Sequence, residues 1–193
     1  MDRTPLHHYP GLSEVLGAEV YVKHENYTAI GSFKIRGGLN TMARLTEEQR
    51  KSGVIVASSG NFGQGIAYAA EIFGVEANVV VPENANPGKV ESMRQLGANI
   101  IFHGRDFDDS REHAERLSKE EGYRYIDAVN EPMLIAGVAT QTLEVIEDMP
   151  DVEAIFMPLG GGSTAAGACI VAKTISPDIQ VVAVQSEEAS GGY

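Results

Sequence analysis

The chain has 193 residues, of which 43% are hydrophobic and 22% are charged, a composition typical of a globular protein with a substantial core. Its 15 basic and 27 acidic side chains give a net charge of −12, which repels nucleic acids and anionic membrane surfaces. A single cysteine, Cys169, excludes an intramolecular disulfide, and the N-terminal residues lack the apolar core of a signal peptide. We therefore expect a cytoplasmic protein of one or two domains.

Short β-branched runs alternate with helical patterns along most of the chain, which is typical of a parallel sheet built from βαβ units. The predicted strands cover residues 19–24, 54–57, 77–81, 100–103, 123–126, 154–158 and 180–185. Helices are predicted to begin at Lys34 and after Thr46, and to cover residues 61–73, 87–96, 106–121, 134–147 and 163–175. This alternation predicts an α/β fold.

Several helix ends carry recognisable signals. Thr46 and Gln49 have the spacing of a capping box, and Asn86 followed by Pro87 fits an N-cap and a first helical residue. No repeat or flexible linker marks a domain border. The polar stretch 127–132 breaks the strand and helix rhythm and is the best candidate for a crossing between domains.

Lys34 lies in a glycine-flanked run, residues 31–38, at a predicted helix start. The positive field of a helix start, the charge of Arg36 and the apolar neighbours Phe33 and Ile35 all disfavour the ammonium form, so they lower the pKa of the lysine. An uncharged amine is what a Schiff-base nucleophile requires. The same run also fits an exposed lysine at a helix entrance, and the octapeptide alone favours neither interpretation.

Two further loops lie between a predicted strand and a predicted helix, where ligands collect in α/β proteins. Ser58-Ser59-Gly60-Asn61 offers hydroxyls, a carboxamide and backbone amides that suit a carboxylate, although helix capping alone explains one of the three polar residues. The run 160–163, Gly-Gly-Gly-Ser, offers amides to a phosphate and would also suit a nucleotide. Because the chain lacks P-loop and dinucleotide fingerprints, a monophosphate fits better.

An amine for a carbonyl, a cradle for a carboxylate and a cup for a phosphate are together what pyridoxal 5'-phosphate joined to an amino acid requires. Three motifs carry a matching resemblance, Ser32-Phe33-Lys34-Ile35-Arg36-Gly37, Ser58-Ser59-Gly60-Asn61-Phe62-Gly63-Gln64-Gly65 and Pro158-Leu159-Gly160-Gly161-Gly162-Ser163. Through them the chain resembles the fold type II pyridoxal-phosphate-dependent enzymes, in particular the threonine/serine dehydratase and serine racemase branch. The resemblance runs from Thr4-Pro5-Leu6 to the C-terminal end.

The resemblance implies two Rossmann-like lobes with mainly parallel sheets, as in the tryptophan synthase β-like fold. The small lobe would cover residues 37–135, and the large cofactor-binding lobe would combine residues 1–36 and 136–193. Relatives usually continue well past Tyr193, and the family's partner of the pyridine nitrogen comes from that later region. We therefore expect the large lobe to be incomplete in this chain.

The resemblance also assigns roles to residues. Lys34 would join the cofactor as a Schiff base and move the α-proton, and Ser59 would act as an acid or base on the opposite face in a racemase. The residues expected to bind the cofactor are Phe33, Lys34, Asn61, Gly160, Gly161, Gly162 and Ser163. Those expected to bind the substrate are Ser58, Ser59, Gly60 and Asn61.

The implied activity is the deamination of L-threonine or L-serine to a 2-oxo acid and ammonia by a lyase of amino-acid metabolism. A racemase or a β-replacement enzyme on the same scaffold and an inactive truncated ligand-binding fragment are the alternatives. We expect a small amino-acid substrate, a homo-oligomer, and neither nucleic acid nor membrane as a partner.

The chain departs from the family pattern at two positions. Phe62 stands where many relatives have a histidine, and phenylalanine donates no hydrogen bond. Gln185 stands where metal-binding relatives place an acidic residue, and an amide is a poorer ligand for a hard cation. The five histidines show no ligand spacing with one another or with the cysteine. We therefore assign no metal ligands.

Overall fold

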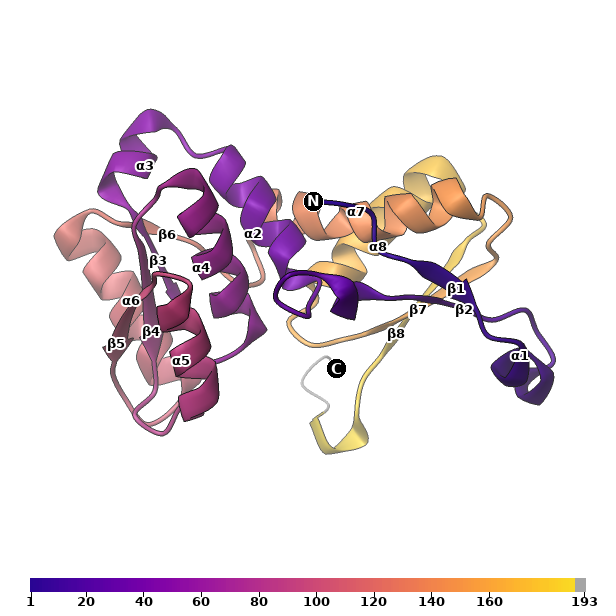
Figure 1. The fold of residues 1–193 in the computed structure, drawn as a ribbon, viewed down its shortest axis with the longest axis horizontal. Helices are drawn as coiled ribbons and strands as arrows, with labels where there is room; N and C mark the ends of the chain where they lie inside the picture. The colour runs from indigo at the N-terminus through magenta and orange to yellow at the C-terminus, as the bar shows by residue number, and fades with distance from the viewer. Residues whose placement is uncertain (190–193) are drawn as a thin grey trace. The chain divides into compact units, whose positions relative to one another are not determined.

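The computed structural model describes residues 1–189, which fall into two compact units (Figure 1). Unit 1 combines Met1–Phe33 with the chain from Ala139 onward, and unit 2 is Lys34–Val138. The sequence-based division lies after residues 36 and 135, whereas the units divide after residues 33 and 138. As a result, Lys34 is the first residue of unit 2.

Unit 2 is built on a four-stranded parallel sheet in the order β5-β4-β3-β6. These strands are β3 (Val54–Ala57), β4 (Ala77–Val81), β5 (Asn99–Phe102) and β6 (Arg124–Tyr125). Every residue of β3 and β4 is buried, as expected for central strands of a parallel sheet that is covered on both faces. The prediction of an α/β fold with mainly parallel sheets is confirmed.

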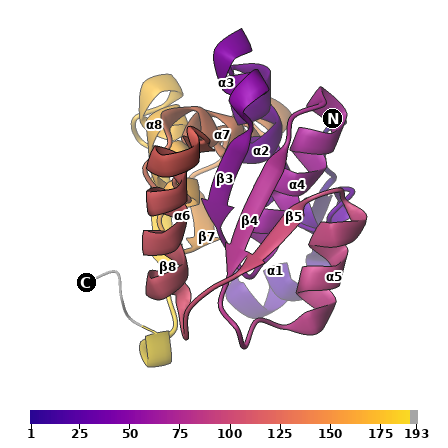
Figure 2. The same ribbon diagram turned by 90° about the vertical axis from the view of Figure 1, so that its left-hand side faces the viewer.

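Helices cover both faces of this sheet. The helices of unit 2 are α2 (Lys34–Ala43), α3 (Glu47–Ser52), α4 (Asn61–Phe73), α5 (Pro87–Gln95) and α6 (Phe107–Glu121). Figure 2 shows α4 and α5 on one face and α6 on the other. The side chains of β3 alternate accordingly, because Val56 packs with Ile66 of α4 and Met93 of α5, whereas Ile55 packs with Ala114 of α6.

The helix starts of unit 2 follow the predicted capping signals. Thr46 and Gln49 form a reciprocal capping box at α3, and the Asn86 side chain accepts hydrogen bonds at the start of α5. Asp106, predicted as the first residue of α6, is its N-cap instead. The caps at Asn86 and Asp106 fix where α5 and α6 leave the carboxyl edge of the sheet.

Unit 1 contains two small sheets. Antiparallel β1 (Leu6–His8) and β2 (Tyr21–Lys23) form one, and parallel β7 (Ala154–Pro158) and β8 (Gln180–Val184) form the other. The helices are α1 (Pro10–Leu16), α7 (Pro132–Asp148), which begins in unit 2, and α8 (Ser163–Ile175), with single turns η1 (Glu25–Tyr27) and η2 (Glu187–Ala189). Ile146, Ala172 and Ile179 form a small core with partly buried residues of β7 and β8.

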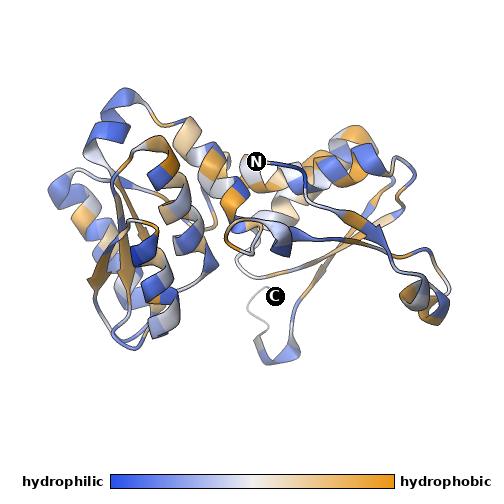
Figure 3. Cartoon of the chain, viewed as in Figure 1, coloured by the Kyte–Doolittle hydropathy of each residue, from blue (hydrophilic) through white to orange (hydrophobic). Residues whose placement is uncertain are grey.

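Hydropathy follows this arrangement. In Figure 3 the central strands β3 and β4 are mainly hydrophobic, whereas α3 is largely hydrophilic. Among residues 1–189, no helix combines the length and the hydropathy that a membrane span requires.

Candidate active site

Lys34 opens α2, and its side chain is half-buried. Burial lowers the pKa of its amine from the ordinary value of 10.5, because removal from water disfavours the ammonium form. The direction is the one expected from the sequence. Its cause is burial, whereas the sequence argument also invoked the helix start and Arg36. At a given pH, a larger fraction of the Lys34 amine is therefore uncharged than in a free lysine. The uncharged amine is the form that attacks a carbonyl.

Glycines hold the first turns of α2 tightly against α4. A Cβ atom on Gly65 of α4 would lie 2.8 Å from the carbonyl oxygen of Lys34, and a Cβ atom on Gly38 of α2 would clash with the carbonyl oxygen of Gly65. Real Cβ atoms do not approach that closely, so only glycine fits at these two positions. The backbone of Lys34 is therefore fixed against the helix that the Ser58–Asn61 loop begins.

Ser58 accepts hydrogen bonds from backbone amides at the start of α4. Its side chain is buried, and its Oγ accepts hydrogen bonds from the amides of Gly63, at 2.9 Å, and Gly60, at 3.2 Å. Capping was the alternative that the sequence left open for this loop, and it describes the Ser58 hydroxyl. Ser58 therefore engages the Gly60 amide, whose carbonyl accepts a hydrogen bond from the Gln64 amide, and the polar groups of Ser59 and Asn61 lie outside this cap.

The open part of the loop lies at the carboxyl end of β3. Ser59 and Asn61 are exposed, and a Cβ atom on Gly60 would meet no other atom within 4 Å. Within the described part of the chain, the amides of Asn61 and Phe62 make no hydrogen bond. Two amides at a helix start, with a hydroxyl and a carboxamide beside them, suit a carboxylate.

A second open helix start follows β7 in unit 1. Gly162 is the N-cap of α8 with φ +91°, and no side chain caps the helix. The Ala166 amide donates to the Gly162 carbonyl at 2.9 Å, whereas the amides of Ser163, Thr164 and Ala165 make no hydrogen bond among residues 1–189. Three such amides at the positive end of a helix suit a phosphate.

Internal packing does not explain the glycine at position 160. Gly160 is exposed, and a Cβ atom built on it would meet no other atom within 4 Å. Gly167 in the same unit differs, because a Cβ atom there would lie 3.0 Å from the Cβ of Ala139. The turn before α8 therefore keeps room for a ligand where a side chain would otherwise project.

The candidate residues form one group in each unit. Lys34 and the loop 58–61 belong to unit 2, where the contact between α2 and α4 links them. Phe33, which is half-buried, and the turn Gly160–Ser163 belong to unit 1. The sequence did not indicate Lys89 of α5, whose Nζ donates a hydrogen bond to Oδ1 of Asn61 at 2.9 Å.

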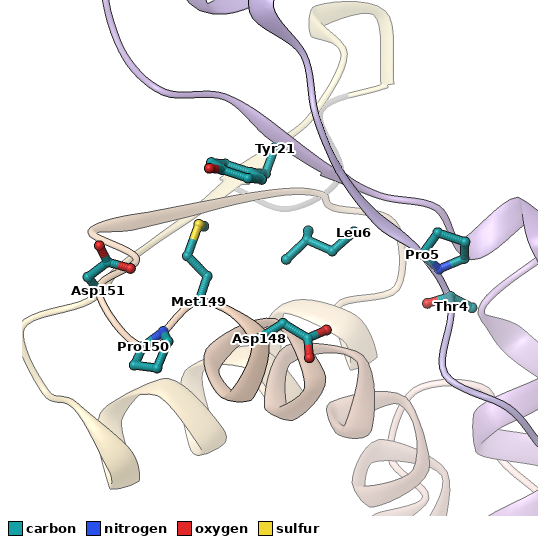
Figure 4. Close-up of a pocket in the computed structure, with 8 residues that line it drawn as sticks. All are labelled: Thr4, Pro5, Leu6, Tyr21, Asp148, Met149, Pro150 and Asp151. Carbon is teal, nitrogen blue, oxygen red and sulfur yellow. The ribbon is translucent and has the colours of Figure 1, made fainter.

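A groove of unit 1 lies apart from these two groups of residues. Residues 1–189 contain no set of three or more His, Cys, Asp or Glu side chains that could hold a metal ion. A groove of about 490 Å³ lies between the first two strands and the end of α7, with Leu6, Tyr21 and Met149 among its lining residues (Figure 4). None of the candidate residues lines it.

Comparison with known sequences identifies the relatives of the chain. Residues 1–192 match the family described as pyridoxal-phosphate dependent enzyme. The L-threonine ammonia-lyase of Thermotoga maritima is 45% identical over 185 residues, which are 96% of this chain and 46% of that protein. The L-threonine dehydratase biosynthetic IlvA of Escherichia coli is 38% identical over 187 residues, which are 97% of this chain and 36% of that protein.

Solved structures of similar enzymes also match the fold of this chain. The processed form of threonine deaminase isoform 2 from Solanum lycopersicum matches with a TM-score of 0.92 and 35% identity, covering 95% of this chain and 51% of that one. Serine racemase from Dictyostelium discoideum matches with a TM-score of 0.92 and 34% identity, covering 97% of this chain and 61% of that one.

The chain spans about half or less of the length of the two sequence relatives described above. The family model nevertheless covers nearly all of it, and the expected resemblance is confirmed. This chain belongs to the family of pyridoxal-phosphate dependent enzymes.

Proposed function

We propose that this chain carries the lysine, the carboxylate site and the phosphate site of an ammonia-lyase that deaminates L-threonine or L-serine. The observation that carries the proposal is the half-buried Lys34, whose pKa burial lowers and whose backbone is fixed against the start of α4. Relatives named as L-threonine ammonia-lyase and L-threonine dehydratase support the choice of reaction.

The described residues fit pyridoxal phosphate. Lys34 offers a primary amine with a lowered pKa to the aldehyde, and the uncapped start of α8 offers three amides to the phosphate. The open space at Gly160 leaves room for the phosphate oxygens. Phe33 and Asn61 would contact the ring, and Gly160, Gly161, Gly162 and Ser163 would hold the phosphate.

The chemistry requires few groups of the protein. When bound, the cofactor supplies a conjugated ring that delocalises the negative charge developing at Cα of the substrate. The uncharged Nζ of Lys34 accepts the proton from Cα. Ser59 and the amides of Asn61 and Phe62 hold the substrate carboxylate, which fixes the direction of the Cα–H bond. The β-hydroxyl takes up the proton that Nζ of Lys34 accepted and leaves as water, and water then hydrolyses the released enamine to a 2-oxo acid and ammonia.

A racemase is the second candidate, and the exposure of Ser59 favours it. Ser59 is exposed, and its hydroxyl would exchange a proton with Cα from the face opposite Lys34, as the resemblance to the racemases implies. The similarity to serine racemase from Dictyostelium discoideum is consistent with this chemistry. Such an enzyme would produce the D-amino acid without net ammonia.

Product analysis tests the proposal. We expect the purified chain, supplied with pyridoxal phosphate, to convert L-threonine or L-serine to a 2-oxo acid and an equal amount of ammonia. Lys34→Ala should lower turnover by about a thousandfold or more, because it removes both the nucleophile and the proton acceptor. Lys51→Ala, which removes an exposed lysine of α3, is the matched control and should retain turnover.

Each outcome has a separate meaning. Undiminished turnover in Lys34→Ala would contradict the assignment of the lysine. D-amino acid without ammonia would favour the racemase. Binding of the cofactor without any product would favour a ligand-binding fragment.

A further inference from the structure

Lys89 of α5 lies beside the loop 58–61, which leads into α4 and is the candidate carboxylate site. Figure 2 shows α4 and α5 on the same face of the unit 2 sheet, and both helices begin after strands whose carboxyl ends lie at one edge. The Nζ of Lys89 donates a hydrogen bond of 2.9 Å to Oδ1 of Asn61, the first residue of α4. The two residues are 28 positions apart in the sequence.

The backbone of Lys89 is held in place by the cap of its own helix. Oδ1 of Asn86 accepts hydrogen bonds from the amides of Gly88, at 2.9 Å, and Lys89, at 3.2 Å. Pro87 fixes the first helical position. The Lys89 side chain therefore extends toward Asn61 from an anchored start, although it is exposed.

The hydrogen bond determines which end of the Asn61 carboxamide faces a ligand. Because Oδ1 accepts from Lys89, the Nδ2 group with its two N–H donors points away from Lys89. An acceptor-rich ligand, such as a phenolate or a carboxylate, needs donors at this place. The ammonium group of Lys89 also polarises the carboxamide and strengthens those donors.

We propose that Lys89 is a positioning residue, which orients the carboxamide of Asn61 so that its N–H donors serve the cofactor or the substrate. The inference rests on the proposed function for the ligand, whereas the orientation itself rests on the contact between α4 and α5. Without Lys89 the carboxamide is free to rotate and to present its oxygen to the ligand, where two acceptors would oppose each other.

A double-mutant cycle on the full chain tests the role. The dissociation constant of pyridoxal phosphate is measured by titration of its visible absorbance. We expect Lys89→Met to raise this constant about tenfold, the worth of one charge-assisted hydrogen bond, and Lys89→Arg to raise it less than about threefold. In an Asn61→Ala background, Lys89→Met should add less than about twofold, because the residue acts through Asn61.

Two results would overturn the role. One is an equal effect of Lys89→Met in both backgrounds, which would show that Lys89 acts independently of Asn61. The other is the absence of any effect of Lys89→Met. Lys51→Met, which removes an exposed lysine on α3, is the control for a general loss of positive charge and should leave the dissociation constant unchanged.

A second measurement needs no cofactor. In NMR spectra of the ligand-free chain, Lys89→Met should shift the side-chain N–H resonances of Asn61, and Lys89→Arg should preserve them. Unchanged resonances in Lys89→Met would contradict the orientation. A wild-type chain that binds no pyridoxal phosphate contradicts the proposed function instead, and the NMR comparison then decides alone whether Lys89 fixes the Asn61 carboxamide.

Discussion

The side chain of Lys34, the proposed catalytic residue, is partly removed from water. Burial lowers the pKa of its amine below the ordinary value of 10.5, so the folded chain gives up this proton at a lower pH than the unfolded chain. Between these two pH values the unfolded chain binds a proton that the folded chain lacks. The contribution of Lys34 to the free energy of unfolding therefore increases as pH rises between these two values, and it decreases as pH falls between them.

Competitive labelling measures the shift directly. A reagent that attacks only uncharged amines should modify Lys34 at a lower pH in the folded chain than in the denatured chain. Peptide mass spectrometry after labelling over a series of pH values gives the two profiles for the same residue. Coinciding profiles would show that the folded chain leaves the amine in ordinary aqueous surroundings.

The sequence predicted the glycine and lysine motifs but not every role within them. The helix starts at Lys34 and after the Gly160–Gly162 turn could be predicted because their signals, such as adjacent glycines, are local. The sequence left helix capping open for one polar residue of the loop 58–61, and only the positions of the Gly60 and Gly63 amides identify Ser58 as that residue. Lys89 could not be found, because its bond to Asn61 depends on how α5 packs beside α4.

The helix pair α2 and α4 gives Lys34 its fixed position. Gly65→Ala would place a methyl group 2.8 Å from the carbonyl oxygen of Lys34. We expect this substitution to lower the free energy of unfolding by about 1–3 kcal/mol, because the helices must separate, and to weaken cofactor binding. Urea unfolding and titration with pyridoxal phosphate measure the two effects.

Gly11→Ala is the matched control for this prediction. Gly11 lies in α1, and a Cβ atom on it would meet no other atom within 4 Å. The added methyl group should therefore stabilise the helix slightly or have no effect, by at most about 1 kcal/mol. A Gly65→Ala variant as stable as the Gly11→Ala variant would refute the close-packing argument.

Most elements could be predicted because their signals are local. The bounds of β3, β4, β7 and α8 agree with the sequence prediction. The elements missed near the N-terminus, β1 and α1, are short, and α1 contains no buried residue. Strand β6 is shorter than predicted, because only Arg124 and Tyr125 pair with β3, and such pairing depends on distant residues.

At the scale of the whole molecule, the division into units reflects packing rather than composition. The polar stretch 127–132 suggested a crossing, yet the division after Val138 lies within α7. Leu134 and Val138 are almost fully buried, and both would contact a Cβ atom on Gly37 of α2. The first turns of α7 therefore pack with unit 2, a contact between distant segments that polarity along the chain does not reveal.

The candidate residues form one group in each unit, with Lys34 and the loop 58–61 in unit 2 and the turn Gly160–Ser163 in unit 1. The family match covers both, because it extends over residues 1–192. The covalent attachment point of the cofactor is therefore the most direct test of the account.

The deciding measurement is the location of pyridoxal phosphate after chemical fixation. The chain is incubated with an equimolar amount of the cofactor, reduced with borohydride, digested and analysed by mass spectrometry. The account predicts one modified site, Lys34, and its loss in Lys34→Ala. Modification spread over exposed lysines such as Lys51 and Lys119, with Lys34 unmodified, would contradict it.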